Sequence, residues 1–127
     1  MTPKDPTQAY RQAAIENAPP LKLVQMLYQG TLRFLHEART AHEAGDLPHF
    51  NDRVGRAQAV VSELRSSLDM SQGPDLCDQL DALYTFSQGC LTEAIIERSP
   101  DHLDAVEQVM RTLLEAWREL DFQAGAS

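Results

Sequence analysis

The sequence predicts an all-α protein, an antiparallel up-down four-helix bundle with a flexible N-terminal arm. Glycine and proline interrupt the chain at intervals of about 20 to 25 residues, as they do at the ends of helices. Between these interruptions apolar residues recur at spacings of three and four, and the alternation typical of strands is absent. Short connections between helices of similar length favour antiparallel neighbours, and this makes the up-down bundle the expected architecture.

Residues 1–18 differ in composition from the rest of the chain. They hold two prolines and a polar stretch in which only Tyr10 and Ile15 are sizeable apolar side chains. We interpret them as a mobile arm that can fold back on a bundle spanning residues 19–122. We expect residues 123–127 to fray, as chain ends without apolar anchors do.

The first helix is predicted at about residues 20–44, between the Pro19-Pro20 pair and Gly45. On a wheel of about 100° per residue, its inward face is formed by Val24, Leu27, Thr31, Phe34, Leu35 and Ala38. The apolar residues that extend past one edge of this face are Leu21, Tyr28 and Leu32. Those that extend past the other edge are Leu23 and Met26.

Three further helices are predicted, at about residues 47–70, 74–97 and 100–121. The inward seam of the second is formed by Phe50, Val54, Ala57, Val61, Leu64 and Leu68. The seam of the third is formed by Leu76, Leu80, Leu83, Ser87, Cys90 or Leu91, and Ala94. The seam of the fourth is formed by Leu103, Val106, Met110, Leu113, Trp117 and Leu120. Phe86 and Ile96 lie well off the third seam.

Composition excludes several classes of function. A formal net charge of −8 disfavours nucleic acid as a partner, because the phosphate backbone requires a cationic face. No run of about 18 apolar residues is present, so no membrane insertion is expected. The N-terminal stretch lacks the basic-then-apolar layout of a secretory signal, which favours a cytoplasmic location.

The sequence also argues against an enzyme, a cofactor and a metal centre. A di-metal site in a bundle needs paired Glu-x-x-His motifs, and the nearest approximation is Asp46 to His49 at a helix start. No glycine-rich phosphate loop appears. His36 is the best placed residue for phosphoryl transfer, but Arg39 and Thr40 stand where phosphotransfer proteins have Lys-Gly. We therefore expect no catalytic, cofactor-binding or metal-binding residues.

The apolar surface exceeds what one core seam requires. A broad core face explains each single residue adequately, whereas the whole set suggests an apolar groove for an amphipathic partner helix, which the arm could cover when no partner is bound. The residues predicted to bind a partner are Tyr10, Ile15, Leu21, Leu23, Met26, Tyr28, Leu32, Phe86 and Ile96.

Several stretches, in order, resemble the flagellar secretion chaperone S family, the flagellin-specific export chaperones. These stretches are Ala9-Tyr10, "KLVQMLYQGTLRFL" at residues 22–35, "RAQAVVSELRSSLD" at residues 56–69, Leu83-Tyr84 with Leu91 and "LTEAIIE", and Trp117. Two departures are visible. Pro19 replaces the serine that usually caps the first helix, and Gln29 replaces an aspartate before the glycine.

The resemblance implies a helical bundle that binds the C-terminal segment of flagellin in the cytoplasm, prevents premature polymerisation and aids delivery to the flagellar export gate. It implies that the arm occupies part of the groove, that Tyr10 contributes to gate docking, and that some members contact an anti-sigma factor or co-chaperone. Two other interpretations of the sequence stay open: a phosphotransfer signalling bundle that uses His36, and a non-flagellar helical interaction module.

Overall fold

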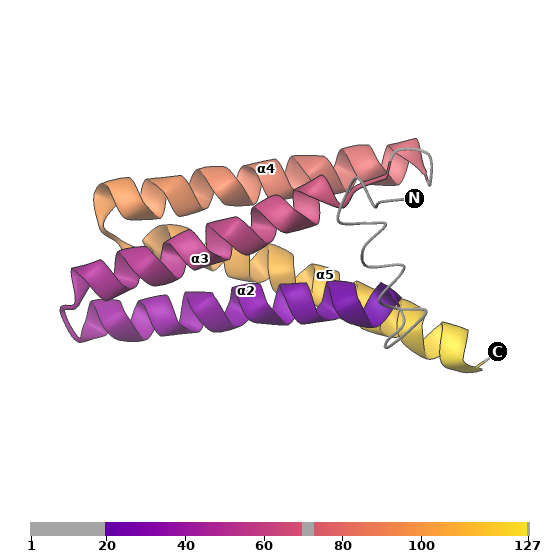
Figure 1. The fold of residues 1–127 in the computed structure, drawn as a ribbon, viewed down its shortest axis with the longest axis horizontal. Coiled ribbons are helices and arrows are strands. Elements are labelled where there is room, and N and C mark those ends of the chain that lie inside the picture. The colour runs from indigo at the N-terminus through magenta and orange to yellow at the C-terminus, as the bar shows by residue number, and fades with distance from the viewer. Residues whose placement is uncertain (1–19, 70–72, 127) are drawn as a thin grey trace, which may run out of the picture.

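The computed structural model describes the backbone of residues 20–69 and 73–126, and the side chains of residues 22–69, 73–120 and 122. In this part of the chain the helices form an antiparallel up-down bundle (Figure 1), which confirms the predicted all-α class. The expectations for the arm, with Tyr10 and Ile15, lie outside the described residues. The same holds for the side chain of Leu21.

The four helices of the described residues are α2 (Pro20–Glu43), α3 (Leu47–Ser66), α4 (Pro74–Glu97) and α5 (Leu103–Ala126). A short 3-10 turn, η2 (Pro100–His102), precedes α5. Helices α2 and α4 each pack against α3 and α5, so that α2 and α4 lie diagonally across the bundle. Helix α5 continues past residue 121, where the sequence predicted its end, and projects beyond the start of α2 (Figure 1).

Local signals in the turns explain where the helices begin and end. The Asp46 carboxylate accepts a hydrogen bond from the His49 backbone N–H at 3.1 Å and thereby caps α3. Gly45 and Gly73 adopt φ values of +75° and +135°, which glycine adopts at little steric cost. Helix α4 ends at Glu97, because the next residue, Arg98, has a left-handed φ of 55°.

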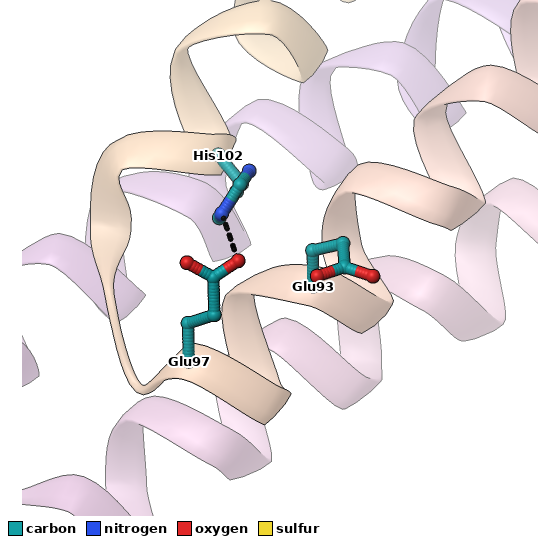
Figure 2. Close-up of side chains that lie close together, drawn as sticks. All are labelled: Glu93, Glu97 and His102. Atoms are coloured by element: carbon teal, nitrogen blue, oxygen red, sulfur yellow. Dashed lines mark hydrogen bonds and ion pairs between the residues drawn. The ribbon is translucent and has the colours of Figure 1, made fainter.

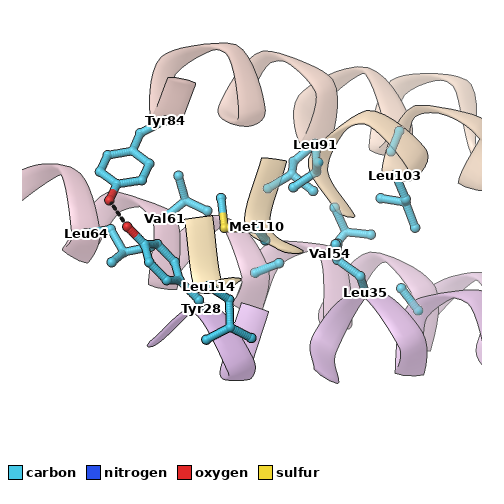
Figure 3. Packing of buried hydrophobic residues seen from close by; sticks show 14 of the residues in the cluster. Tyr28, Leu35, Val54, Val61, Leu64, Tyr84, Leu91, Leu103, Met110 and Leu114 are labelled. Atoms are coloured by element: carbon cyan, nitrogen blue, oxygen red, sulfur yellow. Dashed lines mark hydrogen bonds between the residues drawn. The ribbon is translucent and has the colours of Figure 1, made fainter. Parts of the chain in front are cut away.

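The core runs along the centre of the bundle and receives side chains from all four helices (Figure 3). The seam predicted for the second helix is confirmed from Phe50 to Leu64. Burial of a side chain of this size stabilises the fold by about 1.5–3 kcal/mol. Other large apolar side chains with almost no exposure are Leu35, Leu91, Leu103 and Met110.

Helix α2 is rotated relative to the face that the sequence predicted. Its buried line is formed by Tyr28, Thr31, Leu35 and Ala38. Leu27 and Phe34, predicted to point inward, are only partly buried. The prediction that Tyr28 lies at an accessible edge of the helix, open to a partner, is wrong: its side chain is fully buried.

Helix α4 shows a smaller rotation, because Leu80, Ser87, Leu91 and Ala94 of its predicted seam are buried as expected. The predicted seam residues Leu76 and Leu83 are 50% and 36% exposed. Cys77 and Tyr84, one position further along, are buried in their place. The rotation leaves two leucines on the outside that the sequence assigned to the core.

A buried hydrogen-bonded network explains both rotations. The hydroxyl groups of Tyr28 and Tyr84 lie 2.6 Å apart in the core, and the Trp117 indole N–H donates to the Tyr28 hydroxyl at 2.7 Å. Both tyrosines must point inward to make these bonds, because a buried hydroxyl without a partner costs about 1–3 kcal/mol. The network therefore joins the diagonal helices α2 and α4 to α5.

Tyr28 is the middle member of this network, and that position predicts unequal losses of stability. Tyr28→Phe leaves both the Trp117 indole N–H and the Tyr84 hydroxyl without their partner, so we expect a loss of about 2–3 kcal/mol. Tyr84→Phe leaves the Trp117 bond intact and should cost about 1 kcal/mol. Urea unfolding followed by circular dichroism measures both variants; equal losses would contradict the arrangement.

The same tyrosines predict how stability depends on pH. Burial raises the pKa of Tyr84 well above its usual value of 10.0, and the neighbouring Tyr28 adds to the rise. Burial also raises the pKa of Tyr28. A folded-state pKa above the unfolded one gives a contribution to stability that is complete below about pH 10 and is lost as pH rises further.

We therefore expect at least two of the three tyrosines to stay protonated at about pH 11 and to ionise only as the helices unfold. Tyrosinate absorbance and circular dichroism, recorded over one alkaline titration, measure this. The chain in denaturant is the control, with all three tyrosines ionising near pH 10. Ionisation of all three near pH 10 while the helices persist would contradict the prediction.

Candidate partner-binding surface

The polar contacts of α4 show which of its edges faces α3. The Arg65 side chain of α3 donates to the Asp81 carboxylate at 2.6 Å. Further along α4, the Gln88 amide donates to the backbone carbonyl of Gln58 at 2.9 Å, and the Gln58 amide donates to Thr92 at 3.1 Å. The edge of α4 that carries Asp81, Gln88 and Thr92 is therefore occupied by α3.

The opposite edge of α4 faces α5 and is largely apolar in its first half. Positions separated by four and three residues form one stripe along this edge. The stripe is formed by Gln79, Leu83, Phe86, Cys90, Glu93 and Glu97. Phe86 is 52% exposed and Leu83 is 36% exposed, so this edge presents large apolar side chains to solvent.

Helix α5 also has two chemically different edges. Arg39 of α2 donates to the Asp104 carboxylate at 2.6 Å, and Arg111 and Arg118 line a hollow of about 480 Å³ with Leu32 of α2. That charged edge therefore faces α2. The edge that faces α4 is uncharged and is formed by Val109, Leu113, Ala116 and Leu120.

We define the α4–α5 surface as these two facing stripes together with Leu76. Because α4 and α5 are antiparallel, the start of α4 and the end of α5 lie at the same end of the bundle (Figure 1). At that end a hollow of about 240 Å³ is lined by Trp117 of α5 and Leu76 of α4. Its other walls are formed by Val24, Leu64, Ser67, Leu68, Asp69, Cys77, Leu80 and Tyr84. This hollow is large enough to take an apolar side chain from a partner.

Predicted partner-binding residues fall in different places. Met26, Phe86 and Ile96 are exposed, at 60%, 52% and 67%. Leu23 and Leu32 are partly buried. Of these, only Phe86 belongs to the α4–α5 surface; Met26 lines a separate hollow between α2 and α3 with Leu27, Phe34 and Val60.

The sequence prediction missed most of the α4–α5 surface. Leu76, Leu83 and Leu120 were assigned to core seams, yet each is at least 36% exposed. The sequence was also compatible with the face that is buried. A line through Cys77, Leu80, Tyr84 and Ser87 has the same helical spacing as the predicted seam.

A polar group at the other end of the stripe was also missed. Glu93 and Glu97 extend from the last turns of α4, and His102 extends from η2 toward them (Figure 2). The Glu97 carboxylate lies 2.9 Å from His102 Nε2. One oxygen of each carboxylate and one His102 nitrogen lie within 4.8 Å of one another. A search for Glu-x-x-His does not find them, because the histidine follows the helix end.

Comparison with known proteins decides the family. The family model for the flagellar protein FliS matches residues 3–124 of the chain. The chain belongs to the FliS family. The match spans nearly the whole bundle, and it confirms the resemblance that the sequence motifs indicated.

Curated FliS relatives agree over nearly the full length. The chain is 33% identical to the flagellar secretion chaperone FliS of Vibrio cholerae, covering 89% of this chain and 86% of that protein. It is 38% identical to the flagellar secretion chaperone FliS of Campylobacter jejuni, covering 86% and 84%. It is 29% identical to the flagellar secretion chaperone FliS of Bacillus subtilis, covering 94% and 88%.

Membership of the FliS family places the chain in flagellum assembly and export. In residues 20–69 and 73–126, every helix is too short or too polar to cross a bilayer. The α4–α5 surface is an exposed apolar surface on a member of a chaperone family.

Proposed function

We propose that this FliS-family chain is a cytoplasmic export chaperone that binds the C-terminal segment of flagellin. By holding this segment it prevents premature polymerisation, and it aids delivery of flagellin to the flagellar export gate. The relatives named as flagellar secretion chaperones support the class of function. The identity of the client comes from the family resemblance.

The observation that carries the proposal is the α4–α5 surface. A disordered segment that folds on binding loses conformational entropy, so it needs a large apolar contact to offset that loss. Leu83 and Phe86 on one edge, and Leu120 on the other, supply exposed apolar area along two antiparallel helices. An amphipathic client helix can lie along these edges and insert one side chain beside Trp117.

Binding of this kind requires no catalytic group. The chaperone acts by occupying the apolar face through which one flagellin would contact another, in a stoichiometric complex. Release of flagellin from the chaperone then depends on competition for flagellin at the export gate. The arm, with Tyr10 and Ile15, is proposed to contribute to client and gate contacts, as the resemblance implies, and an anti-sigma factor or co-chaperone is a further proposed partner.

Other apolar residues of the predicted set are proposed as secondary client contacts. They lie on α2 and at the end of α4, outside the α4–α5 surface. These residues are Leu21, Leu23, Met26, Leu32 and Ile96.

Titration calorimetry of the full chain with a flagellin C-terminal peptide tests the function. We expect saturable binding at one peptide per chain. Trp117 is the only tryptophan of the chain and lines the hollow, so a peptide without tryptophan should also shift its fluorescence. A Kd of about 100 µM corresponds to a binding free energy of about −5 kcal/mol. The absence of both heat and fluorescence change at about 100 µM peptide would overturn the proposal.

Phe86→Ser should raise the Kd for this peptide about tenfold or more, because a well-packed aromatic anchor commonly dominates an interface. The same substitution should change the free energy of unfolding by less than about 1 kcal/mol, because the side chain is half exposed. Thr85→Ala, at an exposed neighbour outside the stripe, is the matched control and should leave the Kd unchanged. An unaltered Kd in Phe86→Ser would place the client elsewhere.

A further inference from the structure

We propose that the α4–α5 surface selects its partner by charge: the docked amphipathic helix carries arginine or lysine at the end of its apolar face, where it meets Glu93 and Glu97. The inference rests on the proposed function only in taking the partner to be an amphipathic helix. It adds that the surface distinguishes one amphipathic helix from another by the positive charge at the end of the helix.

The apolar and acidic parts of the surface belong to one line of side chains. Phe86, Cys90, Glu93 and Glu97 follow one another at spacings of four, three and four on the same edge of α4. A partner helix lying along Leu83 and Phe86 therefore continues toward the two carboxylates. Its side chains at that end must either pair with them or leave them in solvent.

The two carboxylates are arranged to receive a cation. Glu93 and Glu97 are one turn apart on α4 and are both exposed; Glu97 points toward His102, and Glu93 lies one turn before it (Figure 2). A guanidinium group has donors in a fixed fork and can bond to two carboxylates at once. A lysine ammonium fits as well, with less directional preference.

Neither α4 nor the edge of α5 that faces it supplies a competing cation; the exposed Arg98 follows directly after α4. Helix α4 contains no lysine or arginine in its 24 residues, although it carries five acidic side chains. On α5, Arg111 and Arg118 lie on the edge that faces α2. Within the described residues, the ion pairs of Glu93 and Glu97 include only His102, at the Glu97 carboxylate. The acidic end is therefore complementary to a positively charged partner end.

The same three side chains could instead hold a divalent metal ion, since carboxylate and imidazole are common metal ligands. Both glutamates are exposed, and they lie in line with an apolar surface that needs a polar boundary. These two facts favour the partner cation. The experiment is therefore run with and without a chelator.

Two synthetic helical peptides with the same apolar face provide the probe. One carries two arginines at one end, and the other carries glutamine at the same positions. At about 50 mM salt, where screening is weak, the full chain should bind the arginine peptide about fivefold more tightly, the sum of two modest exposed ion pairs. Fluorescence anisotropy of labelled peptides measures the ratio of the two Kd values.

The variant Glu93→Gln/Glu97→Gln should reduce this ratio to about one, because the carboxylates no longer attract the arginines. Glu43→Gln/Glu63→Gln is the matched control, since it removes the same charge from exposed positions of α2 and α3 and should keep the full ratio. Urea unfolding checks that both variants fold as stably as the parent chain.

A ratio that persists in Glu93→Gln/Glu97→Gln would overturn the proposal, because the net charge of −8 would then attract arginine without a defined site. A ratio near one in the parent chain, or one that disappears with the chelator, would also overturn it. Failure of the proposed function is seen separately: the flagellin peptide would not bind, while the arginine preference for the model peptide would remain.

Discussion

The hydrogen bond between Tyr28 and Tyr84 is the interaction on which the surface of this bundle depends. It joins α2 and α4, which lie diagonally, and the Trp117 indole from α5 completes it. Burial makes an unpartnered hydroxyl costly, so both tyrosines must point to the same place in the core. Because each helix is rigid, fixing one side chain on each of them fixes which way every other side chain of that helix points.

The exposed apolar surface follows from this rotation. With Tyr84 inside, Leu83 is turned to the edge of α4 that faces α5, and Phe86 is turned further outward on the same edge. The edge of α5 opposite them is uncharged, because its arginines lie on the side of α2. Each of the two helices thus presents an apolar edge, and the side chain of Trp117 belongs to both the core bond and the hollow at the surface.

Much of the fold could be predicted from the sequence, and rather less of the candidate site. The seam of α3 from Phe50 to Leu64 was identified correctly, since its spacing admits one face only. Phe86 was identified as exposed, and it is. Leu83 was assigned to the core instead of the surface, and Tyr28 was assigned to the surface instead of the core. The group formed by Glu93, Glu97 and His102 crosses a helix end, where helical spacing gives no guidance.

The sequence by itself determined the helical class, the positions of the turns and the family, because these depend on glycine, proline, apolar spacing and motifs that act within a few residues. Only the tertiary structure decided the rotation of α2 and α4. On α4, the lines through Leu83 and through Tyr84 both satisfy helical spacing. The choice between them depends on a hydroxyl partner 56 residues away in the chain. Local periodicity carries no information about such a partner, and the hydrogen bond that selects the buried face exists only once the helices have packed.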